Sequence, residues 1–191
     1  KLMKMLFDPQ LFRLDAGIFI LHLVLTAVFV TLPLDLVDAG LVKEKHWMLY
    51  FPAFIGAFFL MVPLIIIGVK KNNTKTMFQL SLLIMMAALA AMGLFADNLW
   101  VLSIAVVLFF TGFNYLEASL PSLIAKFCPV GEKGSAMGVY STSQFLGAFC
   151  GGMLGGGAYQ LLGASGVFFV ALSLMFLWLL LTFGMAKPVL L

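Results

Sequence analysis

An acidic residue, Glu117, lies inside a long apolar stretch of the sequence, with Asn114 one helical turn before it. A carboxyl group at the centre of a bilayer costs about 2.5–3.5 kcal/mol, so such a residue is expected to face other polar groups rather than lipid. In that position it could bind and release a proton, which favours a proton or cation site. The alternative is a protonated Glu117 that only hydrogen-bonds a neighbouring helix.

His22 is the second candidate for proton chemistry. It lies nine residues after Arg13, and Glu117 lies nine residues before Lys126. At a helical rise of about 1.5 Å per residue, both side chains would lie about 13 Å from the same face of the membrane. Equal depth predicts a His–carboxylate pair that exchanges protons, because both groups can titrate in the working pH range. The alternative for His22 alone is a neutral ring bonded to a Ser or Thr.

The stretch 134–161 is rich in glycine. Residues 131–166 hold eleven of the eighteen glycines, and small residues recur there every four positions in two ridges: Gly147, Gly151, Gly155 and Ala148, Gly152, Gly156. Such ridges allow close helix packing in a membrane. Gln144 lies three residues before the first ridge, with Tyr140 one turn earlier. Gln144 could line a cavity, or it could lie at the end of the contact that the glycine ridge makes with another helix, and the sequence favours neither.

Six apolar stretches carry these residues. Of the 191 residues, 63% are hydrophobic and only 10% are charged, with a mean hydropathy of +1.14. A stretch of about 20 apolar residues spans the hydrocarbon core of a bilayer as a helix. We therefore predict an all-α membrane protein with one six-helix transmembrane domain over residues 1–191. Its helices are expected at 9–36, 48–69, 76–96, 100–124, 134–161 and 166–186.

The basic residues predict how the helices are oriented. A net charge of +3 could suggest nucleic-acid binding, but in a six-span topology the cations fall on one side of the membrane, and no nucleic-acid partner is expected. Only Lys43 and Lys45 lie on the other side. Because cytoplasmic loops are enriched in Lys and Arg, both termini are predicted to be cytoplasmic. The inner-side set is Lys1, Lys4, Arg13, Lys70, Lys71, Lys75, Lys126, Lys133 and Lys187.

A short similarity between two parts of the sequence predicts two structural repeats. Thr31-Leu32-Pro33 closes the first stretch, and Ser119-Leu120-Pro121 lies near the end of the fourth, 88 residues on. Three spans separate the two triplets, so they would be inserted in opposite orientation. This arrangement is typical of transporters built from two inverted three-helix repeats.

No cofactor or metal site is expected from the sequence. His22 and His46 fall on different segments without spaced Cys or carboxylate partners, and no phosphate-binding or dinucleotide motif is present. An intramembrane hydrolase using Ser141 and His22 would lack an acid to orient the imidazole. The chain is therefore predicted not to be an enzyme.

Several motifs resemble the major facilitator superfamily, and within it the bacterial drug/proton antiporters of the YajR type. The runs 114–126, 133–147 and 151–156 are similar to helices ten and eleven of that family, and 8–13 and 29–33 to helix seven. The resemblance implies that the chain is the C-terminal half of a twelve-helix carrier. The loop 68–75 departs from the family's signature loop, since it lacks the acid and the second glycine.

The resemblance also implies a function, namely secondary active transport by alternating access in the inner membrane of a bacterium. It implies proton-coupled efflux of small amphipathic compounds, with the N-terminal half of the same transporter, the bilayer, protons and substrate as partners. Glu117 would bind the proton, His22 would be its partner, and Asn114, Gln144 and Tyr140 would line the proton and substrate path. The alternative is a stand-alone six-helix channel or membrane assembly module without transport coupling.

Overall fold

The structure is a computed structural model that describes residues 7–186, so Lys1, Lys4 and Lys187 of the predicted inner-side cations lie outside it. All regular secondary structure in that range is helical. The elements, in chain order, are α2 (Pro9–Asp38), the 3₁₀ turn η1 (Lys43–Lys45), α3 (Trp47–Lys70), α4 (Thr74–Leu94), α5 (Leu99–Phe127) and α6 (Lys133–Phe183).

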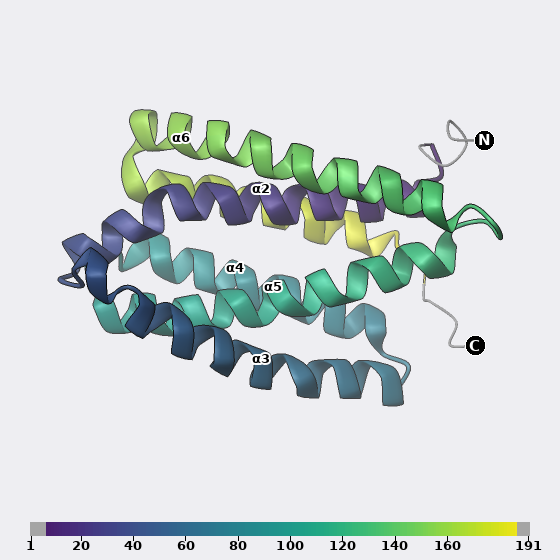
Figure 1. The fold of residues 1–191 in the computed structure, drawn as a ribbon, viewed down its shortest axis with the longest axis horizontal. Coiled ribbons are helices and arrows are strands. Elements are labelled where there is room, and N and C mark those ends of the chain that lie inside the picture. The colour runs from purple at the N-terminus through teal and green to yellow at the C-terminus, as the bar shows by residue number, and fades with distance from the viewer. Residues whose placement is uncertain (1–6, 187–191) are drawn as a thin grey trace.

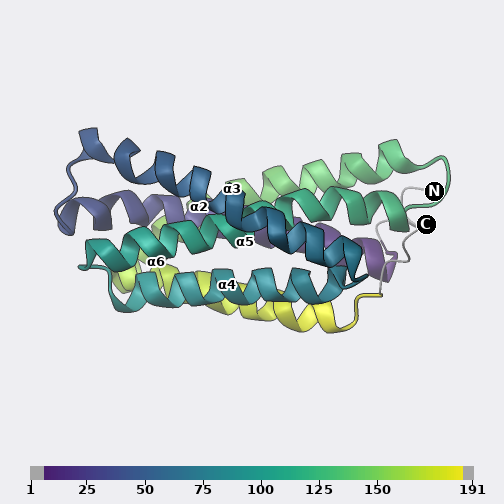
Figure 2. The same ribbon diagram turned by 90° about the horizontal axis from the view of Figure 1, so that it is seen from below.

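The five α-helices form an elongated bundle in which their long axes are roughly aligned, whichever way the chain runs (Figures 1 and 2). Each of the five is long enough and apolar enough to cross a bilayer. Lipid offers no hydrogen-bond partners to the backbone, and a continuous helix satisfies these groups within itself. The chain is therefore a multi-pass membrane protein.

The element α6 consists of two helices joined at Gly163, which has non-helical backbone angles, φ 73° and ψ −174°. The chain turns back near this point, and the end of α6 returns alongside the bundle (Figure 1). Glycine adopts a positive φ at little steric cost, so it suits a reversal of this kind. The predicted stretch 134–161 lies within α6 before Gly163, and the predicted stretch 166–186 begins after Gly163 and runs three residues past the end of α6 at Phe183.

Local signals in the sequence explain where two of the helices begin. The Asp8 carboxylate caps α2 by accepting hydrogen bonds from the backbone N–H groups of Gln10 (2.9 Å) and Leu11 (3.0 Å), and Pro9 occupies the first turn. Asn98 caps α5 by accepting from the N–H groups of Trp100 and Val101. Such side chains satisfy donors that would otherwise have no partner at a helix start.

The first ridge of glycines in α6 packs directly on α2. A Cβ added at Gly147 or Gly151 would collide with the backbone of Phe19 or Leu23, and one at Gly155 would lie 2.8 Å from the Cα atom of Ala27. The contacts advance by four residues on both helices, so α2 and the first part of α6 run in the same direction. The second ridge differs, because a Cβ at Gly152 or Gly156 would meet nothing within 4 Å.

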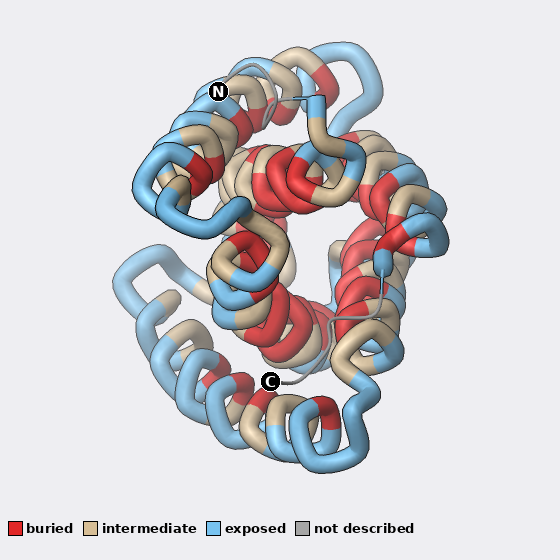
Figure 3. Tube along the Cα trace, turned by 90° about the vertical axis from the view of Figure 1, so that its right-hand side faces the viewer, coloured by how far each residue is buried: buried red, intermediate tan, exposed pale blue. Residues whose placement is uncertain are grey.

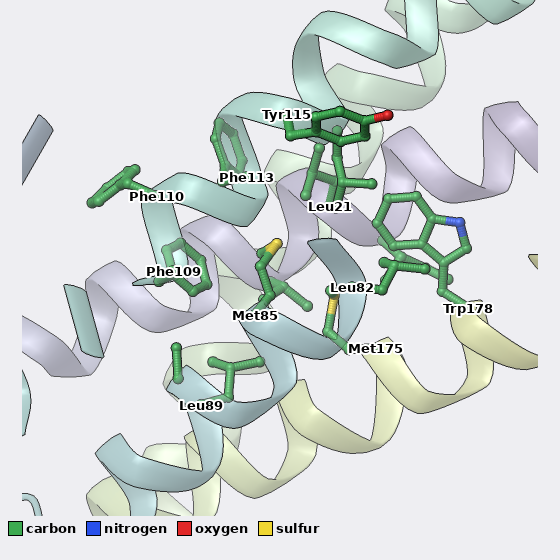
Figure 4. Packing of buried hydrophobic residues seen from close by; sticks show 14 of the residues in the cluster. Leu21, Leu82, Met85, Leu89, Phe109, Phe110, Phe113, Tyr115, Met175 and Trp178 are labelled. Carbon is green, nitrogen blue, oxygen red and sulfur yellow. The ribbon is translucent and has the colours of Figure 1, made fainter. Parts of the chain in front are cut away.

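The core lies where α2, α4, α5 and the second part of α6 meet. Leu82 and Met85 of α4 lie between Phe109 of α5 and Trp178 of α6 (Figure 4), and the Trp178 indole is 1% exposed. Buried positions lie on the sides of the helices that face one another (Figure 3). Most of α3 remains exposed, including Phe58 and Phe59 at 55% and 68%. This face is apolar, as a surface in contact with lipid or another membrane segment requires.

Candidate functional site

Three polar side chains from three different helices meet inside the bundle: His22 of α2, Glu117 of α5 and Gln144 of α6. The Nε2 atom of His22 lies 3.8 Å from Oε2 of Glu117. The side-chain nitrogen of Gln144 lies 2.9 Å from Nε2 of His22, and it donates a hydrogen bond to Oε1 of Glu117 at 3.3 Å. Gln144 therefore bridges the two ionisable groups.

The close approach of α6 to α2 positions the Gln144 amide. Gln144 precedes Gly147 by three residues, so it lies on the face of α6 that carries the buried glycines. Residues three and four apart share a helix face, which brings the amide to the seam between the two helices. Without the glycine contacts the backbones would stand further apart, and the amide could not reach both His22 and Glu117.

The orientation of the Gln144 amide bears on the tautomer of the His22 imidazole. An amide nitrogen only donates hydrogen bonds, so Nε2 of His22 must accept the one from Gln144. With the amide in this orientation the ring proton lies on Nδ1, which is buried and has no hydrogen-bond partner among the described residues. Protonation of Nε2 would require the Gln144 amide to turn its oxygen toward His22 or the ring to pair with Glu117. Protonation of His22 and the orientation of the Gln144 amide are therefore linked.

Aromatic rings adjoin this polar cluster. The Phe113 ring meets the His22 ring edge-on, with centroids 5.7 Å apart. Phe113 also lines an apolar hollow of about 410 Å³ between α2, α3 and α5, together with Leu25, Thr26, Phe29, Phe54 and Phe110. In the pair, the side chain of His22 is 14% exposed and that of Glu117 is 35% exposed. An apolar hollow beside a polar cluster is the usual composition of a small-molecule site.

The other two predicted site residues lie near the cluster without joining its hydrogen bonds in the described part of the chain. Asn114 is half-buried one turn before Glu117 on α5. Tyr140 of α6 is 3% exposed, and its hydroxyl has no hydrogen-bond partner among residues 7–186. Tyr140 lies one helical turn before Gln144 on α6. All five predicted residues thus lie in one region of the bundle, on α2, α5 and α6.

One polar residue of this region, Asp15, was not singled out from the sequence. Asp15 is 9% exposed on α2, and one of its carboxyl oxygens is buried with no hydrogen-bond partner among the described residues. The seven-residue spacing from Asp15 to His22 could have identified it, because that spacing places two residues on one helix face. Within residues 7–186, no three His, Cys, Asp or Glu side chains group as metal ligands.

The apolar helices and their internal polar cluster define a multi-pass membrane protein, and comparisons with known proteins give its family. The sequence profile of the Major Facilitator Superfamily matches residues 14–189. The chain belongs to this superfamily.

Relatives extend this assignment. The chain is 41% identical over 185 residues to the inner membrane transport protein YajR of Escherichia coli (strain K12), which covers 97% of this chain and 41% of that protein. An uncharacterized transporter of Buchnera aphidicola from Schizaphis graminum is 30% identical over 188 residues, covering 98% of the chain and 48% of that protein. Another, BU466 of Buchnera aphidicola from Acyrthosiphon pisum, is 30% identical over 151 residues, covering 79% and 39%. The chain thus spans less than half the length of these relatives.

Proposed function

We propose that the chain is the C-terminal half of a twelve-helix secondary transporter that exports small amphipathic compounds in exchange for protons. The chain covers 41% of the length of YajR, and this share supports the interpretation that it is one half of a transporter. In this proposal α6 makes two crossings separated at Gly163, which gives six spans in two inverted three-helix repeats. The N-terminal half of the same transporter supplies the opposite wall of the substrate cavity.

The cluster of His22, Glu117 and Gln144 is the observation that carries the proposal. An ionisable pair inside apolar helices is costly, so its presence favours a proton or ion pathway. Glu117 is the proton-binding group, and His22 is its partner at 3.8 Å. Gln144 and Asn114 contact the substrate, and Tyr140 lies on the proton path.

The proton and the substrate compete for Glu117, and this competition couples proton uptake to substrate export. When Glu117 is ionised, it attracts the cationic end of a substrate whose apolar part occupies the hollow lined by Phe54, Phe110 and Phe113. When Glu117 takes up a proton, that attraction is lost and the substrate is released. A ligand shifts a two-state carrier only through its different affinity for the two states, and protonation provides this difference.

The described cations support an orientation with both termini in the cytoplasm. Lys70 ends α3, Lys75 lies in the first turn of α4 and Lys126 lies near the end of α5. The Lys75 ammonium donates hydrogen bonds to the backbone carbonyls of Phe183 (2.9 Å) and Met185 (2.8 Å), so the end of α6 lies at the same end of the bundle. Lys43 and Lys45 lie in η1, at the other end. Cytoplasmic faces are the ones enriched in Lys and Arg.

The test uses the intact transporter in sealed vesicles, with ethidium as a cationic amphipathic probe and an imposed proton gradient. Wild-type protein should move ethidium against its gradient, and Glu117→Gln should abolish this movement. Asp97→Asn is the control, because Asp97 is an exposed acid in the turn before α5. Equal proton-driven transport by wild type and Glu117→Gln would reduce Glu117 to a helix contact and refute the mechanism.

A further inference from the structure

A separate pocket of about 130 Å³ lies at the Lys-rich end of the bundle, between α3, α4 and α5. It is enclosed by the end of α3, the first residue of α4 and the last turns of α5. A pocket in which several polar groups converge is a candidate binding site. We call it the Lys126 pocket, and half of its ten lining residues are polar: Thr74, Tyr115, Ser119, Ser122 and Lys126.

The helix α5 carries the Lys126 pocket and the polar cluster on opposite faces. The four polar pocket residues of α5 run from Tyr115 to Lys126 at intervals of four, three and four residues, so they share one face. Glu117 lies two residues before Ser119, which is about 200° round a helix of 3.6 residues per turn. The Lys126 pocket is therefore distinct from the proposed proton and substrate site.

Contacts between three helices fix one wall of the pocket. Tyr115 is 2% exposed, and its hydroxyl donates a long hydrogen bond to the Thr74 carbonyl at 3.5 Å. The Thr74 hydroxyl donates in turn to the Gly68 carbonyl, also at 3.5 Å. Gly68 allows the phenol to approach α3, because a Cβ there would lie 3.3 Å from the Tyr115 oxygen. The pocket is thus part of the packed structure of α3, α4 and α5.

The charge of the pocket is positive. Lys126 is the one charged side chain among the described residues that line it, and it forms no ion pair within residues 7–186. The Lys75 ammonium nearby is instead bound to backbone carbonyls at the end of α6. Phosphate oxygens accept charge-assisted hydrogen bonds from ammonium groups. Lys126 and the hydroxyls of Ser119 and Ser122 can therefore donate to one phosphate group.

The surroundings favour a phosphate that is carried by a lipid. Lys126 lies one residue before the end of α5, and basic pockets between helix ends bind anionic headgroups. Val69, which lines the pocket, is 53% exposed, and Ile66, one turn earlier on α3, is 44% exposed. Phe59 continues this exposed apolar row. It lies five residues after Phe54, about 140° round α3 from the side that lines the aromatic hollow. The row therefore faces away from the proposed substrate cavity, where acyl chains can cover it.

We propose that the Lys126 pocket binds the phosphate group of an anionic phospholipid such as phosphatidylglycerol. Lys126 neutralises the phosphate, the two serine hydroxyls donate hydrogen bonds to it, and the acyl chains lie along Val69 and Ile66. A zwitterionic headgroup binds more weakly, because its cationic end meets no acid among the lining residues. The bound lipid contacts α3, α4 and α5 together and stabilises the packing of their ends. This binding does not depend on the proposed proton coupling.

Native mass spectrometry of the intact transporter in non-ionic detergent, titrated with phosphatidylglycerol, tests the site. Wild type should retain phosphatidylglycerol several-fold more tightly than phosphatidylcholine. Lys126→Gln should weaken the tightest phosphatidylglycerol site about fivefold, the contribution of one lysine beside an anionic lipid, and Lys126→Arg should restore it. Lys133→Gln is the matched control, because Lys133 is an exposed lysine that begins α6 and lies outside the pocket. It should leave the tightest site unchanged.

Ala118→Leu tests the pocket without a change of charge. Ala118 is an exposed lining residue, so the larger side chain should occupy the pocket, leave the unfolding temperature unchanged and weaken phosphatidylglycerol binding several-fold. Equal retention of phosphatidylglycerol by wild type, Lys126→Gln and Ala118→Leu would overturn the inference, as would an equal loss in Lys133→Gln.

Inorganic phosphate distinguishes a lipid from a free anion. At an equal concentration it should not displace phosphatidylglycerol, because it lacks the acyl chains. If it displaced the lipid and bound the delipidated transporter in a Lys126-dependent manner, the ligand would be a free anion and the lipid assignment would be wrong. Absence of ethidium transport by wild type would instead refute the proposed export and leave the lipid result unaffected.

Discussion

The Nε2 atom of His22 and the Oε2 atom of Glu117 lie 3.8 Å apart, although the two residues belong to the first and fourth long helices of the described chain. The Gln144 amide contacts both of them from a third helix. A single proton therefore changes the hydrogen bonds of α2, α5 and α6 together. This connection between three helices is a means by which protonation could alter how they pack.

We predict that His22 and Glu117 act as one unit in proton-driven transport. Glu117→Gln and His22→Gln should each lower ethidium efflux at least tenfold, and the double variant should lose no more than Glu117→Gln alone. Residues that act together give non-additive losses in this way. Initial rates in vesicles at equal expression measure the effect. Losses that multiply in the double variant would show that the two residues act independently.

The Gln144 amide provides a second prediction. Gln144→Ala removes the donor to Glu117, and a hydrogen bond to a charged group contributes about 1.5–3 kcal/mol, so transport should fall by about tenfold or more. Gln144→Glu should be worse, since it places a like charge beside Glu117. Thr142→Ala is the control, because Thr142 is exposed on the same helix and its hydroxyl only donates to the Gly138 carbonyl. If the Gln144→Ala variant transported ethidium at the wild-type rate, Gln144 would not be part of the proton and substrate path.

Counting residues along the sequence predicted the depth of the site but not its composition. The distances of His22 from Arg13 and of Glu117 from Lys126 are set by helical rise alone, so they could be read without a structure. Which way a side chain points around the bundle depends on helix packing. The same count therefore could not show that Gln144 reaches both His22 and Glu117.

The glycine ridges illustrate the same limit for the fold. Their four-residue period predicted close helix packing, and it was identical in both ridges. Only one ridge, with Gly147, Gly151 and Gly155, lies against α2, while the Gly152 side is open. Which ridge packs on α2 depends on how the first part of α6 is rotated about its own axis. That rotation is determined by all the helices that pack against it. The reversal of the chain at Gly163 likewise depends on one backbone conformation that the composition of the turn does not specify.

The contrast between the two ridges gives a third prediction. Gly151→Ala should destabilise the transporter by about 1–3 kcal/mol, the usual cost of overpacking, because the new Cβ would meet the backbone of Leu23 and not a flexible side chain. Gly152→Ala, the next residue, is the matched control and should stay within about 0.5 kcal/mol of wild type, since its Cβ would meet nothing within 4 Å. Thermal unfolding of the purified transporter in detergent measures both. Equal unfolding temperatures for the two variants would contradict the packing of α6 on α2.

The aromatic hollow provides the fourth prediction, which concerns substrate affinity. Phe54 of α3 lines the hollow with its ring centroid 4.3 Å from that of Phe110, whereas Phe58, one turn later, lies outside it. Both rings are largely exposed in this half, at 45% and 55%, so truncation should cost similar stability. Phe54→Ala should raise the KM for ethidium by about two- to tenfold, because an aromatic contact contributes about 0.5–1.5 kcal/mol beyond its buried area. Phe58→Ala should leave KM unchanged, and kcat should change little in either variant. A KM that rises equally in both variants, or in neither, would place the apolar part of the substrate elsewhere in the cavity.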